Sequence, residues 1–145
     1  MSMAASTSWL CLIEACDSIR AGRYARFVFV GDYVDRGPDT RRVVDFLIER
    51  QPRGKDQFMC LRGNHDDLLI RAAKKERTDA DLINWWGNGG ERTLESYGVD
   101  DPSELPKEHL AWIDALPIKF TDHRRLFVHA GIRPGISISD QDEQE

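Results

Sequence analysis

Three loops of this sequence carry side chains that can bind metal ions or phosphate. Each loop directly follows a run of apolar residues, and these runs end at Val30, Leu61 and Val128. Carboxylates, an arginine, an amide and imidazoles are all present in the three loops. The side chains concerned are Asp32, Asp35, Arg36, Asn64, His65, Asp66 and His129.

These side-chain types together suit the hydrolysis of a phosphoester. Carboxylate, amide oxygen and imidazole are ligands for a divalent metal such as Mn, Fe or Zn. Arg36 offers a planar fork of donors that matches a phosphate group. A metal generates hydroxide and neutralises charge on the phosphoryl oxygens, and an acid must protonate the leaving oxygen. The three loops therefore suggest a metal-dependent phosphoester hydrolase.

Each of these residues also has a simpler structural interpretation. Asp32 after a strand can cap a helix or form a turn. Asp35 and Arg36 can form a surface ion pair of little energetic value. Asn64 can be a turn residue, and His129 can be a hydrogen-bonded core histidine. Because all of them occur at three strand ends, we prefer the functional interpretation for the set.

The surrounding sequence predicts an α/β fold. Residues 26–30 form a continuous run of β-branched and aromatic side chains, which is typical of a buried strand in a parallel sheet. In open α/β sheets the site lies beyond the carboxyl ends of the strands, so we expect the three loops to meet at one edge. Strands are predicted over 26–30, 57–61, 118–120 and 125–128, and helices over 7–20, 39–48, 65–72, 78–97 with a break at 87–90, and 106–115.

Length and composition exclude several classes of protein. The 145 residues fit one domain, and the formal charge of −5 argues against a non-specific grip on nucleic acid. No apolar run reaches the roughly 20 residues of a membrane span. The three cysteines fit no closed disulfide framework, so we expect reduced thiols and a cytoplasmic location. Trp85 and Trp86 are expected in the core or a cleft wall, and His109 and His123 receive no role.

Three motifs resemble those of the calcineurin-like metallophosphoesterases. They are Gly31-Asp32-Tyr33-Val34-Asp35-Arg36-Gly37, Gly63-Asn64-His65-Asp66 and His129-Ala130-Gly131. More narrowly, they look like the branch that holds the serine/threonine protein phosphatases and the symmetrical diadenosine tetraphosphatases. The likeness extends from about Trp9 to Ile136. It implies a partial metallophosphoesterase sandwich of β-sheet flanked by helices, as one incomplete domain over residues 1–145.

The resemblance implies a metal centre. Asp32 matches the carboxylate that bridges two divalent metals in the family. Asn64 and His129 match ligands of the second metal. Two metals about 3.5–4 Å apart would hold a bridging hydroxide for in-line attack at phosphorus.

The resemblance also implies roles in catalysis and substrate binding. His65 matches the proton donor to the leaving group, and Asp35 matches the carboxylate that orients it. Arg36 matches a phosphate-binding arginine, and Asn64 is expected to contact the substrate as well.

Two departures from the family pattern lead us to expect a chain truncated at both ends. Family members begin with an Asp-x-His motif, but here no histidine precedes His65. The family also places a histidine ligand well after the His-Ala-Gly match, but here no histidine follows His129. The chain is thus expected to bind only one metal, and weakly.

The motifs do not decide whether the substrate is that of the protein phosphatases or that of the dinucleotide hydrolases. Tyr33-Val34-Asp35-Arg36 looks like the protein phosphatases, whereas Asp66 and Ala130 look more like the bacterial dinucleotide hydrolases. We interpret the protein as a phosphoprotein phosphatase-like hydrolase of a phosphorylated substrate. The alternatives are a symmetrical dinucleoside polyphosphate hydrolase and a non-catalytic remnant of the fold that lacks a complete metal site.

Overall fold

The computed structural model describes Ala15 and residues 26–53 and 58–141. The helix predicted for residues 7–20 lies outside the described residues, apart from Ala15. The remaining elements follow the predicted order closely. They are β1 (Phe27–Phe29), α2 (Thr40–Arg53), β2 (Phe58–Cys60), α3 (Asn64–Ala73), α4 (Asp79–Gly87), α5 (Glu91–Tyr97), a 3-10 turn (Pro102–Glu104), α6 (Lys107–Asp114), β3 (Lys119–Thr121), β4 (Leu126–Val128) and a second 3-10 turn (Ile138–Asp140).

The strands form two separate pairs rather than one sheet within the described residues. β1 and β2 are parallel, with Phe27 opposite Phe58 and Phe29 opposite Cys60. β3 and β4 form an antiparallel hairpin, with Lys119 opposite Val128. The expected α/β class is confirmed, and so is the parallel pairing of the 26–30 strand. The third loop, however, reaches the site from a different sheet.

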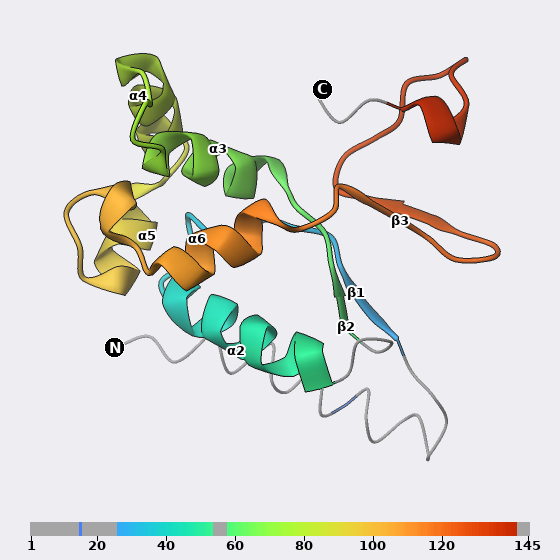
Figure 1. Cartoon of the computed structure of the whole chain (residues 1–145), viewed down its shortest axis with the longest axis horizontal. Helices are drawn as coiled ribbons and strands as arrows, with labels where there is room; N and C mark the ends of the chain where they lie inside the picture. The colour runs from blue at the N-terminus through green and yellow to red at the C-terminus, as the bar shows by residue number, and fades with distance from the viewer. Residues whose placement is uncertain (1–14, 16–25, 54–57, 142–145) are drawn as a thin grey trace.

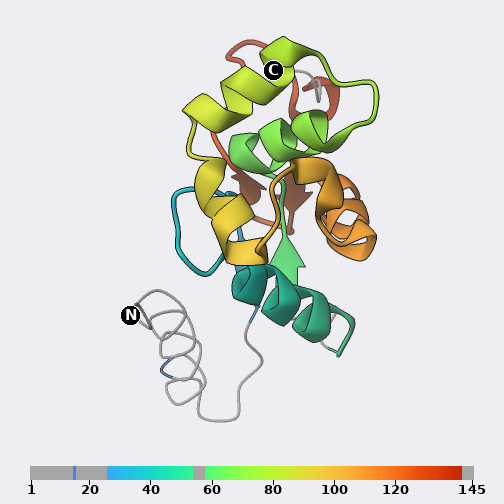
Figure 2. The same ribbon diagram turned by 90° about the vertical axis from the view of Figure 1, so that its left-hand side faces the viewer.

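The helices gather on one side of the β1–β2 pair, and the β3–β4 hairpin projects on the other (Figure 1). A view turned by 90° again places the helices in front and the hairpin behind (Figure 2). Val44 and Leu47 are three residues apart on α2, as expected for one apolar helix face, and both are fully buried. They belong to a core that includes Leu69, Trp85 and Ile113 from α3, α4 and α6. This core fixes where α3 and α4 meet the loops of the site.

Local signals explain where several helices begin and end. Thr78 precedes α4 and accepts a hydrogen bond from the Asp81 backbone N–H at 3.2 Å, while Asp81 accepts from the Thr78 N–H at 2.9 Å. This reciprocal pair is a capping box. Gly98 ends α5 with a φ of 69°, a conformation that glycine adopts without steric cost. The predicted break at 87–90 separates α4 from α5. Among the described residues, no helix is long and apolar enough to cross a membrane.

Candidate active site

The loop after β1 has an unusual backbone. Gly31, Asp32, Asp35 and Arg36 have φ values of 101°, 60°, 64° and 53°. Three of these residues carry a Cβ atom, and the left-handed region costs such residues about 1–2 kcal/mol each. Strain of this kind persists only where the surroundings impose it, and it clusters at functional sites. The contacts that impose it come from the loop after β2 and from α3, α4 and α5.

Asp66 ties the first loop to the second. Its side chain is fully buried and accepts hydrogen bonds from three backbone N–H groups. Oδ2 accepts from Asp32 at 2.9 Å and from Gly63 at 2.8 Å, and Oδ1 accepts from Tyr33 at 3.0 Å. Burial raises the pKa of Asp66 to about 6, although the three backbone hydrogen bonds act in the opposite direction. Asp66 therefore sets the position of Asp32 relative to the start of α3.

Two glycines allow the loops to approach this closely. A Cβ atom on Gly31 would lie 2.4 Å from the backbone nitrogen of Gly63. A Cβ atom on Gly63 would lie 2.4 Å from Oδ1 of Asp32 and 3.0 Å from Cε1 of His129. Any larger residue at either position would push the three loops apart. Gly31 and Gly63 of the motifs are therefore needed because only a residue without a Cβ atom fits at this contact.

His129 brings the third loop to the other two. Its Nδ1 lies 2.6 Å from the carbonyl oxygen of Val30, which can only accept, so Nδ1 carries the hydrogen. Its Nε2 lies 2.9 Å from Oδ1 of Asn64 and 3.5 Å from Oδ1 of Asp32. In the neutral ring, Nε2 then presents a lone pair to two oxygen atoms. Three acceptor atoms that face one another repel, and a cation or a proton between them removes this repulsion.

Two separations among these three acceptor atoms are compatible with ligands of one divalent metal ion. Ligand atoms about 2.1 Å from one metal lie about 3.0 Å apart at right angles and about 3.4 Å apart in a tetrahedron. The separations of Nε2 of His129 from the oxygens of Asn64 and Asp32 fall close to these values. In the described residues no group of three or more His, Cys, Asp and Glu side chains is arranged to hold a metal. The third donor here is instead the amide of Asn64.

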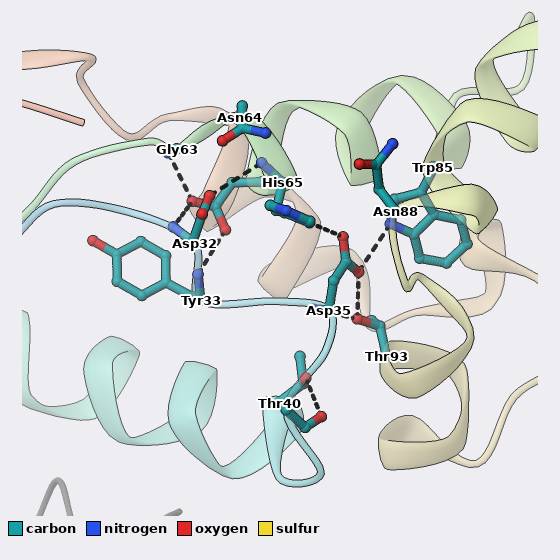
Figure 3. Close-up of polar contacts among 12 residues, drawn as sticks. Asp32, Tyr33, Asp35, Thr40, Gly63, Asn64, His65, Trp85, Asn88 and Thr93 are labelled. Atoms are coloured by element: carbon teal, nitrogen blue, oxygen red, sulfur yellow. Dashed lines mark hydrogen bonds and ion pairs between the residues drawn. The ribbon is translucent and has the colours of Figure 1, made fainter. Parts of the chain in front are cut away.

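His65 and Asp35 form a buried pair beside these donors. Nδ1 of His65 lies 2.8 Å from Oδ2 of Asp35. The other oxygen of Asp35 accepts from Nε1 of Trp85 at 3.0 Å and from Oγ1 of Thr93 at 2.8 Å (Figure 3). Asp35 is only 5% exposed, and burial raises its pKa despite these hydrogen bonds. The interpretation of Asp35 and Arg36 as a surface ion pair is therefore wrong.

The remaining donor, Arg36, has an exposed side chain next to this pair in sequence. Its backbone N–H donates to the carbonyl of Gly89 at 3.4 Å, which ties the loop to the break between α4 and α5. The structure thus brings Asp32, Asn64 and His129 together and joins His65 to Asp35. It leaves Arg36 open to solvent.

Sequence reasoning missed three residues that position this site. Asp66 was noted without a role, yet a carboxylate three residues after the helix cap is a signal for bonds to free N–H groups. Trp85 was expected in the core or a cleft wall; it is fully buried, and it also donates to Asp35. Thr93 both donates to the Asp35 carboxylate and accepts from the Asp35 backbone N–H at 2.8 Å. Trp85 and Thr93 lie 50 and 58 residues from Asp35, so no local pattern points to either contact.

A cavity of about 520 Å³ opens beside Asn64 and His129. Asn64 and His129 form part of its wall, together with residues from α3, the β3–β4 hairpin and the segment after β4. A volume of this size is typical of small-molecule sites. The candidate site therefore has both a set of reactive groups and a space next to them.

The fold thus brings side chains of metal-ligand type and a histidine–aspartate pair together beside one cavity. The sequence model of the calcineurin-like phosphoesterases matches residues 9–144. The chain belongs to this family, which confirms the resemblance of its three motifs.

Curated relatives include two symmetrical bis(5'-nucleosyl)-tetraphosphatases and a polyphosphatase. The tetraphosphatases of Pseudomonas syringae pv. syringae and P. syringae pv. tomato are each 30% identical to the chain, over 75% and 78% of its length. A zinc-dependent endopolyphosphatase of Saccharomyces cerevisiae is 24% identical over 79% of the chain. The matches cover 33%, 33% and 40% of these relatives, so the chain spans little more than a third of their length.

Proposed function

We propose that this chain is a metal-dependent phosphoester hydrolase in which Asp32, Asn64 and His129 hold a divalent cation. One observation carries the proposal. Nδ1 of His129 is committed to the carbonyl of Val30, and Nε2 faces two side-chain oxygens at metal-ligand separations. A backbone carbonyl that fixes the tautomer of a histidine in this way is a common feature of metal sites.

A cation at these atoms supplies charge neutralisation on the phosphoryl oxygens and activates the attacking water. The chain's own residues do the rest. The exposed guanidinium of Arg36 binds the phosphate through two parallel hydrogen bonds. Asp35 holds Nδ1 of His65, so that Nε2 is the ring nitrogen that gives its proton to the leaving oxygen. Trp85 and Thr93 keep the Asp35 carboxylate in place for this task.

The proposal includes the finer details that the family resemblance implies. Asp32 would bridge two metal ions if all the metal ligands of the family were present, and Asn64 would also contact the substrate. Manganese is the metal we expect to be most useful in assays, and the expected location is cytoplasmic. The relatives favour a substrate with a phosphate chain, since two are named as dinucleoside tetraphosphatases and one as an endopolyphosphatase. A phosphoprotein is the alternative substrate, as the Tyr33-Val34-Asp35-Arg36 motif suggests.

Hydrolysis of p-nitrophenyl phosphate by the 145-residue chain tests the activity. We expect release of p-nitrophenol that depends on added Mn²⁺. His65→Asn should reduce the rate about 10²–10⁴-fold, the usual contribution of a general acid, while leaving Mn²⁺ binding intact. His123→Asn is the matched control, because His123 is an exposed histidine in the β3–β4 turn.

Three outcomes have distinct meanings. Turnover that is lost only in the His65 variant supports the proposed roles. Turnover that is equal in both variants contradicts the role of His65. Bound Mn²⁺ without any turnover contradicts the proposed activity and supports the non-catalytic alternative.

A further inference from the structure

The junction of α4 and α5 contains two adjacent glycines that lie against two different groups of the candidate site. A Cβ atom on Gly89 would lie 3.2 Å from Cγ of Arg36, and a Cβ atom on Gly90 would lie 2.4 Å from Cε2 of Trp85. Gly87, at the end of α4, has nothing within 4 Å of its Cβ position. Of the three glycines at this junction, Gly89 and Gly90 therefore make the close contacts.

Gly89 fixes the start of the Arg36 side chain. The Arg36 backbone has a φ of 53°, and its N–H donates to the carbonyl of Gly89 at 3.4 Å. The same carbonyl accepts from the N–H of Arg92 at 3.2 Å, which holds it against the first turn of α5. The Cβ position of Gly89 lies close to both Cγ and the backbone nitrogen of Arg36. These contacts set the direction in which the exposed Arg36 side chain leaves its loop.

Gly90 holds both residues that donate to the Asp35 carboxylate. Its N–H donates to the carbonyl of Trp85 at 3.3 Å, and its carbonyl accepts from the N–H of Thr93 at 3.0 Å. The side chains of Trp85 and Thr93 donate to the same oxygen of Asp35 (Figure 3). Cε2 of Trp85, the atom nearest to the Cβ position of Gly90, is bonded directly to the donor nitrogen Nε1. A methyl group on Gly90 would therefore displace this donor.

We infer that Gly89 and Gly90 are positioning residues for two separate steps of the reaction. Gly89 positions Arg36, which binds the phosphate both before and during bond cleavage, so a change there raises KM. Gly90 positions the Asp35–His65 pair, whose proton is needed only as the leaving oxygen departs, so a change there lowers kcat. The inference rests on the proposed function for the roles of Arg36 and His65.

Steady-state kinetics of Gly89→Ala and Gly90→Ala with Mn²⁺ and two substrates separate these roles. We expect Gly89→Ala to raise KM for p-nitrophenyl phosphate about three- to tenfold with little change in kcat. We expect Gly90→Ala to lower kcat about tenfold, with a larger loss on phenyl phosphate than on p-nitrophenyl phosphate. Phenolate is the poorer leaving group and depends more on the proton, whereas a loss of folded protein would reduce both rates equally.

Two other glycines provide matched controls. Gly98 has a φ of 69° and nothing within 4 Å of its Cβ position, so Gly98→Ala also places alanine at positive φ but touches no group of the site. Gly87→Ala adds a methyl group at the same junction without a contact. Both controls should leave KM and the ratio of the two rates unchanged. A rise in KM in Gly98→Ala equal to that in Gly89→Ala would overturn the role of Gly89. An equal loss on both substrates in Gly90→Ala would overturn the role of Gly90.

Second variants cover the case in which a glycine variant does not fold. Gly89→Asn also adds a Cβ atom, and asparagine tolerates positive φ better than alanine does. In an Arg36→Gln background, the change at Gly89 should have no further effect on KM, because the side chain that it displaces is gone; a further rise would overturn its role. Trp85→Phe removes the donor that Gly90 positions and should show the same larger loss on phenyl phosphate; equal losses would overturn this role.

Calorimetric titration of orthophosphate in the presence of Mn²⁺ separates the inference from the proposed function, because it needs no turnover. Orthophosphate binding should weaken about three- to tenfold in Gly89→Ala and stay unchanged in Gly98→Ala. This result without any turnover would contradict the proposed activity but support the role of Gly89. Orthophosphate binding that is the same in both variants and in the parent chain would overturn the role of Gly89 even if the parent chain is active.

Discussion

Replacing Gly63 by alanine is the sharpest test of how the loops are assembled. The backbone of Gly63 has a φ of −99°, which alanine adopts freely, so the change adds only a methyl group. That methyl carbon would lie 2.4 Å from Oδ1 of Asp32, and ordinary contacts begin near 3.4 Å. Asp32 must therefore move by about 1.0 Å, and the Cε1 atom of His129, 3.0 Å away, must move as well.

We expect Gly63→Ala to lower the free energy of unfolding by about 1–3 kcal/mol, as in other overpacked sites. Because it displaces two of the three proposed ligands, it should also weaken Mn²⁺ binding about 10–100-fold. Urea denaturation and calorimetric titration with Mn²⁺ measure the two effects. Gly131→Ala is the control, because a Cβ atom there meets nothing within 4 Å although His129 is two residues away. Unchanged Mn²⁺ affinity in Gly63→Ala would refute the close contact of the three loops.

Two other substitutions test the groups around the site and the fold. Trp85→Phe removes the donor at 3.0 Å from Asp35 and should cost about 1.5–3 kcal/mol of stability, with a lower hydrolysis rate. Trp86→Phe, at a 49% exposed position, should change neither, and an equal effect of both would contradict the role of the Trp85 N–H. Asp101→Asn breaks the pair in which Arg77 donates to both oxygens, at 2.8 and 2.5 Å, and should cost about 1 kcal/mol at pH 7 in urea denaturation. The hydrogen bond from Arg77 holds the pKa of Asp101 below its usual range, so this stabilisation is fully present above the unfolded pKa of about 4 and is lost gradually as the pH falls from there through the folded pKa. A cost of Asp101→Asn that did not decrease at all as the pH was lowered from 7 to about 2 would contradict this account.

The strands and the order of the elements follow from local patterns in the sequence. The run 26–30 contains β1, and the break at 87–90 separates α4 from α5, because β-branched runs and glycine-rich turns act through neighbouring residues. The meeting of the three loops was also predictable, since strand ends in α/β folds gather functional side chains. The separation of the β3–β4 hairpin from the β1–β2 pair was not predictable, because the pairing of one strand pair with another depends on contacts between residues distant in sequence.

In the candidate site, too, some contacts were predictable from the sequence and others were not. The pairing of His65 with Asp35 was predicted from the motifs, and the structure places Nδ1 of His65 2.8 Å from Oδ2 of Asp35. The donors from Trp85 and Thr93 were missed, because they reach Asp35 only after α4 and α5 pack onto the core.

The central claim is that Asp32, Asn64 and His129 form one metal site. Calorimetric titration of Mn²⁺ into the 145-residue chain tests it most directly, with Asp32→Asn, Asn64→Ala and His129→Ala compared against His123→Ala. We predict a saturable site that is weakened at least tenfold by each of the three substitutions and unchanged in the His123 control. Mn²⁺ binding that is the same in all of these variants, or no binding to the parent chain, would contradict the account.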